Sequence, residues 1–195
     1  MEEFRPVRQF DAVVFDMDGT LVASPLDFAR IRAELGVPDG QGILEALDGH
    51  DEPRRGRLHG RLLEMELDAA DCAELMPHAV ATLDAVRSGG LKTALLTRNA
   101  GPVMRTLLER FAGLRFDIAW SREDGPIKPE PDGVLRACRR LDVLPARTAC
   151  VGDFHLDLVA ANAAAAVSIL LARPPLPDWA GEADHVIRSL AALPR

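Results

Sequence analysis

The sequence predicts a three-layer α/β protein, with a parallel β-sheet between two layers of helices and a small helical segment inserted after the first strand. Short apolar runs that end in polar residues alternate with helical patterns over residues 77–187. Residues 24–76 carry helical periodicity and no convincing strand. The length of 195 residues suits one packed domain with a small insertion and is too short for two full-sized domains.

The first expected strand, Ala12 to Phe15, is a continuous apolar run that ends in Asp16-Met17-Asp18-Gly19-Thr20. Residues two apart on an extended chain point the same way, so Asp16 and Asp18 can converge, and Gly19 allows a tight turn beyond them. Two such charges 4 Å apart repel by about 4 kcal/mol at an effective dielectric of about 20. A shared proton or a bound cation can offset this repulsion. By itself, the same string is also typical of a simple turn.

The inserted segment is expected to contain three helices, at residues 25–35, 43–47 and 52–75. The domain prediction is therefore a core formed by residues 1–22 and 78–195, with a helical cap at residues 23–77. Arg54, Arg57 and Arg61 lie at helical spacing in this segment, and His50 and His59 lie near them. A solvated helix face is the simpler interpretation of these side chains, and contact with an anionic substrate is the alternative.

The second half of the chain is expected to alternate between helices and strands. The expected helices are 77–86, 102–112, 131–141 and 157–164, and the expected strands are 91–96, 116–120, 148–151, 167–171 and 185–187, with a last helical turn near Leu193. Repeated alternation implies parallel strands joined by right-handed crossovers.

Polar residues follow the expected strands, and parallel strands place their carboxyl ends at one edge of the sheet. Besides Asp16 and Asp18, this edge is expected to receive Thr97, Lys128 and the pair Asp153 and Asp157. Several carboxylates around one point form a hard-cation site, for which Mg²⁺ is the expected occupant. A Mg²⁺ site beside a lysine and a threonine suits phosphoryl transfer, in which one aspartate can act as the nucleophile and another as the general acid and base.

Four ordered motifs resemble those of the haloacid dehalogenase (HAD) superfamily. They are DMDGTL at Asp16 to Leu21, the strand that ends in Thr97, KPEPD at Lys128 to Asp132, and GDFHLD at Gly152 to Asp157. The resemblance is greatest to the phosphoglycolate-phosphatase-like branch with a helical cap, and it implies a Rossmann-like core. Arg98, Phe154 and His155 depart from the small or amide residues common at these positions.

The resemblance implies a role for each motif residue. Asp16 would be the nucleophile and a Mg²⁺ ligand, and Asp18 would be the general acid and base, with its backbone carbonyl on the metal. Thr97 would bind a phosphoryl oxygen, Lys128 would stabilise negative charge, and Asp153 would be a further metal ligand. Asp157 would belong to the metal site or cap the following helix. The predicted substrate-binding residues are Gly19, Thr20, Arg98 and Asn99.

The predicted function is that of a Mg²⁺-dependent phosphatase that hydrolyses a small phosphorylated metabolite, phosphoglycolate-like or a sugar phosphate, through an aspartyl-phosphate intermediate. A phosphomutase with the same motifs is the enzymatic alternative. A non-catalytic binding module is the alternative from another class. One sequence leaves open which ester is bound, because fold alone does not specify a substrate.

Composition bears on partners and location. A net charge of −7 argues against nucleic acid as the main partner. The most apolar stretch, residues 163–172, is well short of the ~20 residues that cross a bilayer, and no signal-length apolar segment begins the chain. Cys72, Cys138 and Cys150 are interpreted as small core residues in a reducing compartment. We therefore expect a cytoplasmic protein without a membrane partner, as a monomer or homodimer.

Overall fold

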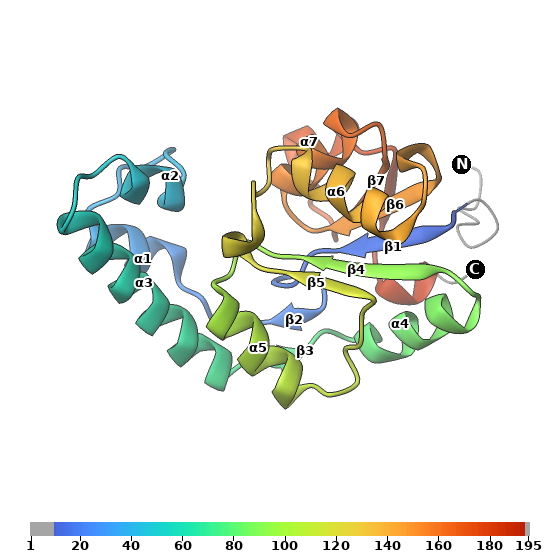
Figure 1. Cartoon of the computed structure of the whole chain (residues 1–195), viewed down its shortest axis with the longest axis horizontal. Coiled ribbons are helices and arrows are strands. Elements are labelled where there is room, and N and C mark those ends of the chain that lie inside the picture. The colour runs from blue at the N-terminus through green and yellow to red at the C-terminus, as the bar shows by residue number, and fades with distance from the viewer. Residues whose placement is uncertain (1–9, 194–195) are drawn as a thin grey trace.

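A computed structural model describes residues 10–193 of the chain and contains a six-stranded parallel sheet at its centre (Figure 1). The strands are β1 (Ala12–Phe15), β4 (Lys92–Leu96), β5 (Ile118–Trp120), β6 (Thr148–Gly152), β7 (Val167–Leu171) and β8 (His185–Ile187). They are ordered β5-β4-β1-β6-β7-β8, and all neighbours are parallel. This confirms the predicted α/β fold and puts β1 between β4 and β6.

Helices cover both faces of the sheet. They are α4 (Ala79–Ser88), α5 (Gly101–Arg110), α6 (Asp132–Leu141) and α7 (His155–Ala163). Figure 1 shows α4 and α5 on one side of the sheet and α6 and α7 on the other. Side chains of β1 alternate between the two layers: Val13 and Phe15 pack in the cluster that includes α4 and α5, and Ala12 and Val14 pack in the cluster that includes α6 and α7. Burial on both faces explains why the strands are almost wholly apolar.

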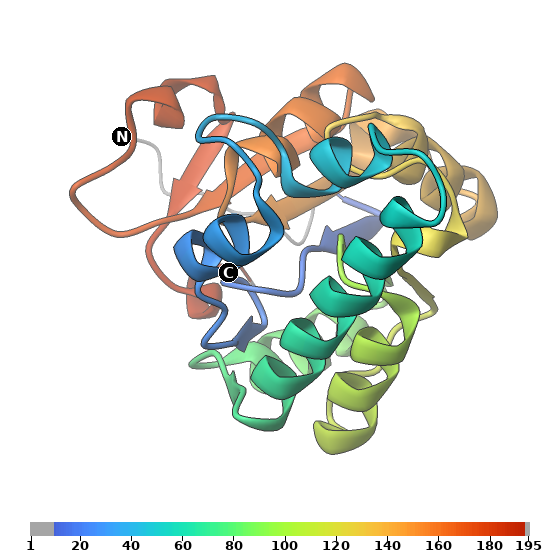
Figure 2. The same ribbon diagram turned by 90° about the vertical axis from the view of Figure 1, so that its left-hand side faces the viewer.

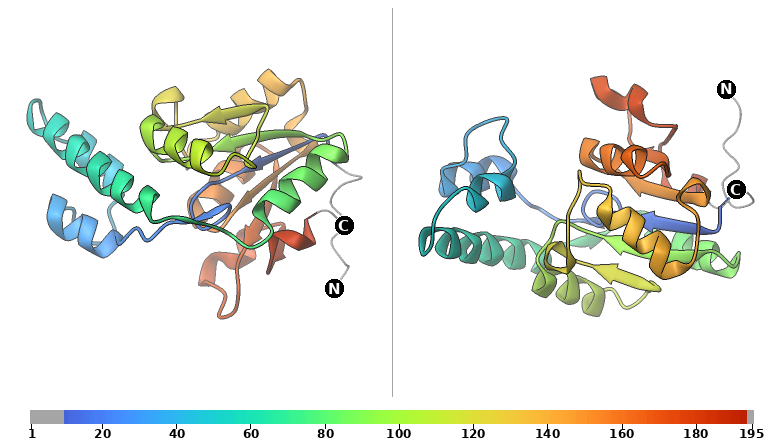
Figure 3. Two further views of the ribbon diagram at one scale, coloured as in Figure 1. Left: turned by 90° about the horizontal axis from the view of Figure 1, so that it is seen from below. Right: turned by 45° about the horizontal axis from the view of Figure 1, so that its top comes forward.

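Three helices lie between β1 and the rest of the sheet in sequence: α1 (Phe28–Leu35), α2 (Ile43–Asp48) and α3 (Arg54–Asp71). We call them the three-helix insertion. They enclose an apolar cluster of their own, which includes Ile31, Leu47 and Leu62. Seen from below in Figure 3 (left), they project from the end of the sheet, and in Figure 2 they lie in front of it. The insertion therefore faces the carboxyl end of β1.

A two-stranded antiparallel ribbon joins the insertion to the core. It pairs β2 (Val22–Ala23) with β3 (Glu74–Leu75), so the outgoing and returning chains run side by side. The expectation of no strand between residues 24 and 76, and of a helix reaching residue 75, is therefore wrong at this end. Each ribbon strand has two residues, too few to show a period-two pattern in the sequence.

The other differences between the structure and the expectations from the sequence are small. The first insertion helix begins at Phe28 because Asp27 accepts a hydrogen bond from the Arg30 amide at 2.9 Å and caps the helix. Cys138 and Cys150 are buried as expected, but Cys72 is exposed at the end of α3, so its interpretation as a core residue is wrong. Among the described residues, no helix has the length and apolar character needed to span a bilayer.

Candidate active site

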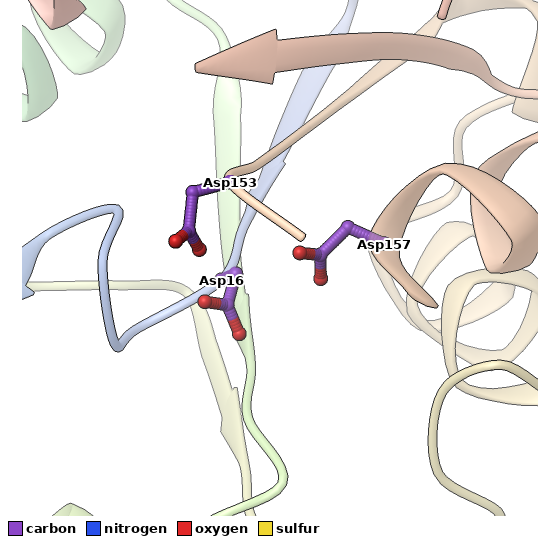
Figure 4. A group of neighbouring side chains, drawn as sticks. All are labelled: Asp16, Asp153 and Asp157. Atoms are coloured by element: carbon purple, nitrogen blue, oxygen red, sulfur yellow. The ribbon is translucent and has the colours of Figure 1, made fainter. Parts of the chain in front are cut away.

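The carboxyl ends of the three neighbouring strands β4, β1 and β6 bring together residues that lie far apart in the sequence. Asp16 follows β1, Thr97 follows β4 and Asp153 follows β6. Figure 4 shows Asp16, Asp153 and Asp157 with their carboxylates directed toward one another. A carboxylate oxygen of each lies within 4.8 Å of one from each of the others. We call these three residues the carboxylate cluster.

Lys128 lies against this cluster. Its ammonium Nζ donates to Asp16 Oδ1 at 2.5 Å and to Asp157 Oδ1 at 2.6 Å, and its side chain is 10% exposed. Three ionised carboxylates and one ammonium leave two net negative charges, which matches the charge of a divalent cation. Of the six residues expected at this edge, Asp16, Lys128, Asp153 and Asp157 lie against one another.

Asp157 contacts both the start of α7 and Lys128. Its Oδ2 accepts a hydrogen bond from the Phe154 amide at 3.1 Å, which satisfies an N–H at the start of α7. Its Oδ1 at the same time contacts Lys128. A Cβ at Gly152 would lie 2.2 Å from Asp157 Cγ, so the approach of this carboxylate to β6 requires glycine.

Asp18 lies outside the carboxylate cluster and has its own partners. Ser24 Oγ donates to Asp18 Oδ1 at 2.7 Å, and Asn99 Nδ2 donates to Asp18 Oδ2 at 2.5 Å. Burial raises the pKa of Asp18, although the hydrogen bonds from Ser24 and Asn99 oppose this. A buried carboxyl with a raised pKa suits proton donation near neutral pH. Ser24 was absent from the predicted residues because a lone serine before a helix carries no signal.

Burial also raises the pKa of two of the cluster carboxyls, those of Asp16 and Asp153. The pKa of Asp16 lies well above its usual value, since burial outweighs the attraction of Lys128, and Asp157 and Asp18 raise it further. Burial, with repulsion from Asp157, raises the pKa of Asp153 to about 6. Burial opposes ionisation of Lys128 as well, but the neighbouring carboxylates Asp157 and Asp16 raise its pKa overall. This collection of acids is thus costly to ionise without further positive charge.

The remaining predicted residues surround the cluster. Thr20 Oγ1 donates to Asp153 Oδ1 at 3.4 Å, and buried Thr97 accepts the Asn99 amide at 3.1 Å through its Oγ1. Arg98 is directed to the insertion: its Nη2 lies 2.9 and 3.1 Å from the two carboxylate oxygens of Glu45 in α2. Its Nη1 donates to the Lys128 carbonyl. Arg98 therefore bridges the edge of the site and the insertion.

The insertion's basic residues have contacts away from the cluster. Arg61 pairs with Glu34 at 2.5 Å and with Glu64 at 2.8 Å, and His59 pairs with Asp48 at 2.8 Å. These contacts fit a solvated helix face. A different pair, Glu66 and Arg122, joins the insertion to the core and is buried. The sequence offered no signal for it, because single charged residues 56 positions apart resemble surface residues.

Gly19 is required where the chain turns past Asp16. Its φ is +77°, and a Cβ would lie 2.1 Å from Asp153 Oδ2. We expect Gly19→Ala to destabilise the protein by about 1–3 kcal/mol from backbone strain, with more from displacement of Asp153. Gly40 is a matched control, since its φ is +78° and nothing lies within 4 Å of its Cβ position. Urea unfolding of both variants measures the difference, and an equal loss would show that the close approach of Asp153 costs nothing.

Comparison with known proteins gives consistent matches. Residues 10–165 match a family model described as haloacid dehalogenase-like hydrolase. An uncharacterized hydrolase of Saccharomyces cerevisiae is 30% identical, over 88% of this chain and 81% of its own. A plasmid-encoded phosphoglycolate phosphatase of Cupriavidus necator is also 30% identical, over 94% and 91% of the two chains. The crystal structure of a HAD phosphatase from Thermococcus onnurineus superposes with a TM-score of 0.70 at 25% identity, covering 94% of this chain and 96% of the other.

Proposed function

Because this chain belongs to the haloacid dehalogenase-like hydrolase family, we propose that it is a Mg²⁺-dependent phosphatase that acts on a small phosphorylated metabolite. The observation that carries this proposal is the carboxylate cluster gathered around Lys128 at the carboxyl edge of the sheet. The similarity to phosphoglycolate phosphatase supports a phosphoric monoester as the substrate. A phosphoglycolate-like ester or a sugar phosphate is the proposed class.

The donor set fits Mg²⁺. Carboxylate oxygens are the ligands this hard cation prefers, and those of Asp16, Asp153 and Asp157 lie within 4.8 Å of one another. In the proposal these residues hold the ion together with the backbone carbonyl of Asp18. When bound, Mg²⁺ neutralises negative charge on the phosphoryl group and orients it.

The protein's own side chains supply the two chemical steps. An Asp16 carboxylate oxygen attacks phosphorus and forms an aspartyl phosphate, while the ester P–O bond breaks and Asp18 gives a proton to the leaving oxygen. Water then attacks the same phosphorus, Asp18 takes a proton from it, and Asp16 is released as a carboxylate with phosphate as product. In the proposal, Lys128 and Thr97 stabilise the transferred group, and Gly19, Thr20, Arg98 and Asn99 surround it.

We assign residues 23–77 the role of a cap over a core of residues 1–22 and 78–195, of which 1–9 and 194–195 lie outside the described residues. Two ion pairs between the insertion and the core support this assignment, Glu45 with Arg98 and Glu66 with Arg122. A cap in this position would exclude bulk water from the reacting groups.

A screen of phosphate esters tests the proposal. Phosphoglycolate, hexose phosphates, nucleoside monophosphates and pyridoxal phosphate are incubated with the protein and Mg²⁺, with EDTA as the control. Release of free phosphate that EDTA abolishes supports the phosphatase. An isomeric sugar phosphate in place of free phosphate would indicate a phosphomutase, and no conversion of any ester would indicate a binding module.

Mg²⁺ is expected to stabilise the fold in a pH-dependent way. The pKa of Asp153 rises from 3.8 to about 6 on folding, so between these values this carboxyl binds more protons in the folded protein than in the unfolded chain. Without metal, the contribution of Asp153 to stability therefore falls as pH rises through this window. Ionised Asp153 is then free to bind the cation. At a free Mg²⁺ concentration of about 100 times its Kd, binding adds about 2.7 kcal/mol to the free energy of unfolding.

Thermal unfolding with Mg²⁺, against a sodium chloride control of equal ionic strength, measures this at about pH 5 and about pH 8. We expect a larger increase in Tm at the higher pH. Asp153→Asn should reduce the increase at the higher pH. An equal increase at both values would contradict the assignment of Asp153.

A further inference from the structure

Glu66 of α3 and Arg122, which follows β5, form an ion pair at the junction of the insertion and the core. Glu66 Oε1 lies 2.5 Å from Arg122 Nη1, and the two side chains are only 8% and 10% exposed. Most ion pairs of the insertion lie at its surface: Arg61 and Glu34, for example, are 40% and 33% exposed. The Glu66–Arg122 pair is therefore unusual in being shielded from water.

Stability alone does not account for this pair. Burial raises the pKa of Glu66 even though Arg122 opposes the effect. Glu66 Oε2 is buried and has no hydrogen-bond partner among residues 10–193. A buried pair with an unsatisfied oxygen is weak evidence for stabilisation, because well-packed apolar residues are often at least as favourable.

Arg122 and its neighbour hold the loop between β4 and α5, residues 97–100. Arg122 Nη1 donates to the Arg98 carbonyl at 3.3 Å, and the Arg122 amide donates to the Asn99 carbonyl at 3.1 Å. Glu123 Oε2 accepts the Gly101 amide at 2.7 Å, directly after the loop. Residues 122 and 123 thus hold the backbone at Arg98 and Asn99 of the loop and at Gly101 after it.

The loop in turn holds Asp18. Asn99 is 5% exposed, and its Nδ2 donates to Asp18 Oδ2 at 2.5 Å. A change in the position of the Asn99 backbone would move this amide and with it the carboxyl of Asp18. One continuous series of contacts therefore runs from α3 of the insertion, through Arg122 and Asn99, to Asp18.

We propose that Glu66 and Arg122 are positioning residues for Asp18, which couple the seating of the insertion on the core to the placement of the proton donor. The proposal rests on the proposed phosphatase function. It assigns the pair no contact with the substrate. Its effect is exerted on the two proton transfers of Asp18, to the leaving oxygen and from the attacking water.

The dependence of the rate on the leaving group therefore distinguishes this role from a merely structural one. An alkyl phosphate has a basic leaving oxygen that needs a proton, whereas the nitrophenolate of p-nitrophenyl phosphate leaves readily without one. Misplacing Asp18 should therefore lower kcat/KM, which reports the steps up to formation of the aspartyl phosphate, for the alkyl ester and spare it for the aryl ester. A merely structural role would lower both rates together.

Two variants test the pair. Glu66→Ala removes the carboxylate, and the double variant Glu66→Leu with Arg122→Met replaces the pair by apolar groups, so that no unpaired charge is buried. We expect each to lose about tenfold or more in kcat/KM on an alkyl ester that the wild type hydrolyses, and at most about twofold in kcat/KM on p-nitrophenyl phosphate. Glu66→Gln, which keeps an acceptor for Arg122, should recover most of the loss.

The matched control is Glu34→Gln, which breaks the exposed pair between α1 and Arg61 of the same α3 helix and should change neither rate. Circular dichroism and thermal unfolding establish that each variant is folded, and Asp18→Asn gives the reference loss on each ester. Equal loss of kcat/KM on both esters in a folded variant overturns the positioning role. A wild-type protein inactive on both esters overturns the proposed function and this inference with it.

Discussion

Asp16→Asn is expected to reduce phosphate release to the background rate while the protein stays folded. Asp16 supplies the attacking oxygen in the proposed mechanism, and an amide is a much weaker nucleophile than a carboxylate. The substitution keeps the shape of the side chain and removes one of the like charges that face each other in the carboxylate cluster. Its effect on stability should accordingly be small compared with its effect on activity.

Phosphate release in a coupled assay measures the effect, and acid-quenched protein can be examined for covalently bound phosphate. The wild type should carry such phosphate during turnover, and Asp16→Asn should not. Asp39→Asn, the same change at an exposed position, serves as the control and should leave activity unaltered. Retention of most activity by Asp16→Asn would remove the nucleophile from the mechanism.

Asp18→Asn is expected to lower kcat by on the order of a hundredfold or more, the usual worth of general acid and base catalysis. Burial raises the pKa of Asp18, so its carboxyl holds a proton more readily than an exposed aspartate does. Ser24 and Asn99 fix the carboxyl by donating hydrogen bonds to its two oxygens. Asparagine would keep the size of the group and lose the ability to give and take a proton.

The measurement is kcat for a series of esters whose leaving groups differ in basicity. Because the second step also needs a base, hydrolysis of the aspartyl phosphate should slow as well, and covalently bound phosphate should accumulate in Asp18→Asn. Asp39→Asn again controls for the loss of a carboxylate. A loss of less than tenfold on the most basic leaving groups would contradict the proton-transfer role.

Much of the fold could be predicted because buried elements need apolar residues at regular positions in the sequence. A strand covered on both faces must be apolar throughout, as in Ala12–Phe15 and Val167–Leu171. The β2–β3 ribbon was missed because two residues per strand carry no period. Cys72 was misassigned because residue type suggests burial but does not locate a residue at the exposed end of a helix.

The amino-acid sequence was enough to predict which chemical groups follow the strands at this edge: two aspartates after the first strand, Thr97, Lys128, and the pair Asp153 and Asp157. It could do so because strand ends are local features, and parallel strands share one carboxyl edge. Which of these groups contact one another depends on the packing of the folded chain. The tertiary structure separates Asp18 from the carboxylate cluster, pairs it with Ser24 and Asn99, and buries Glu66 against Arg122. Such contacts depend on how the insertion packs on the core, and single polar residues far apart in the chain leave no periodic trace of that packing.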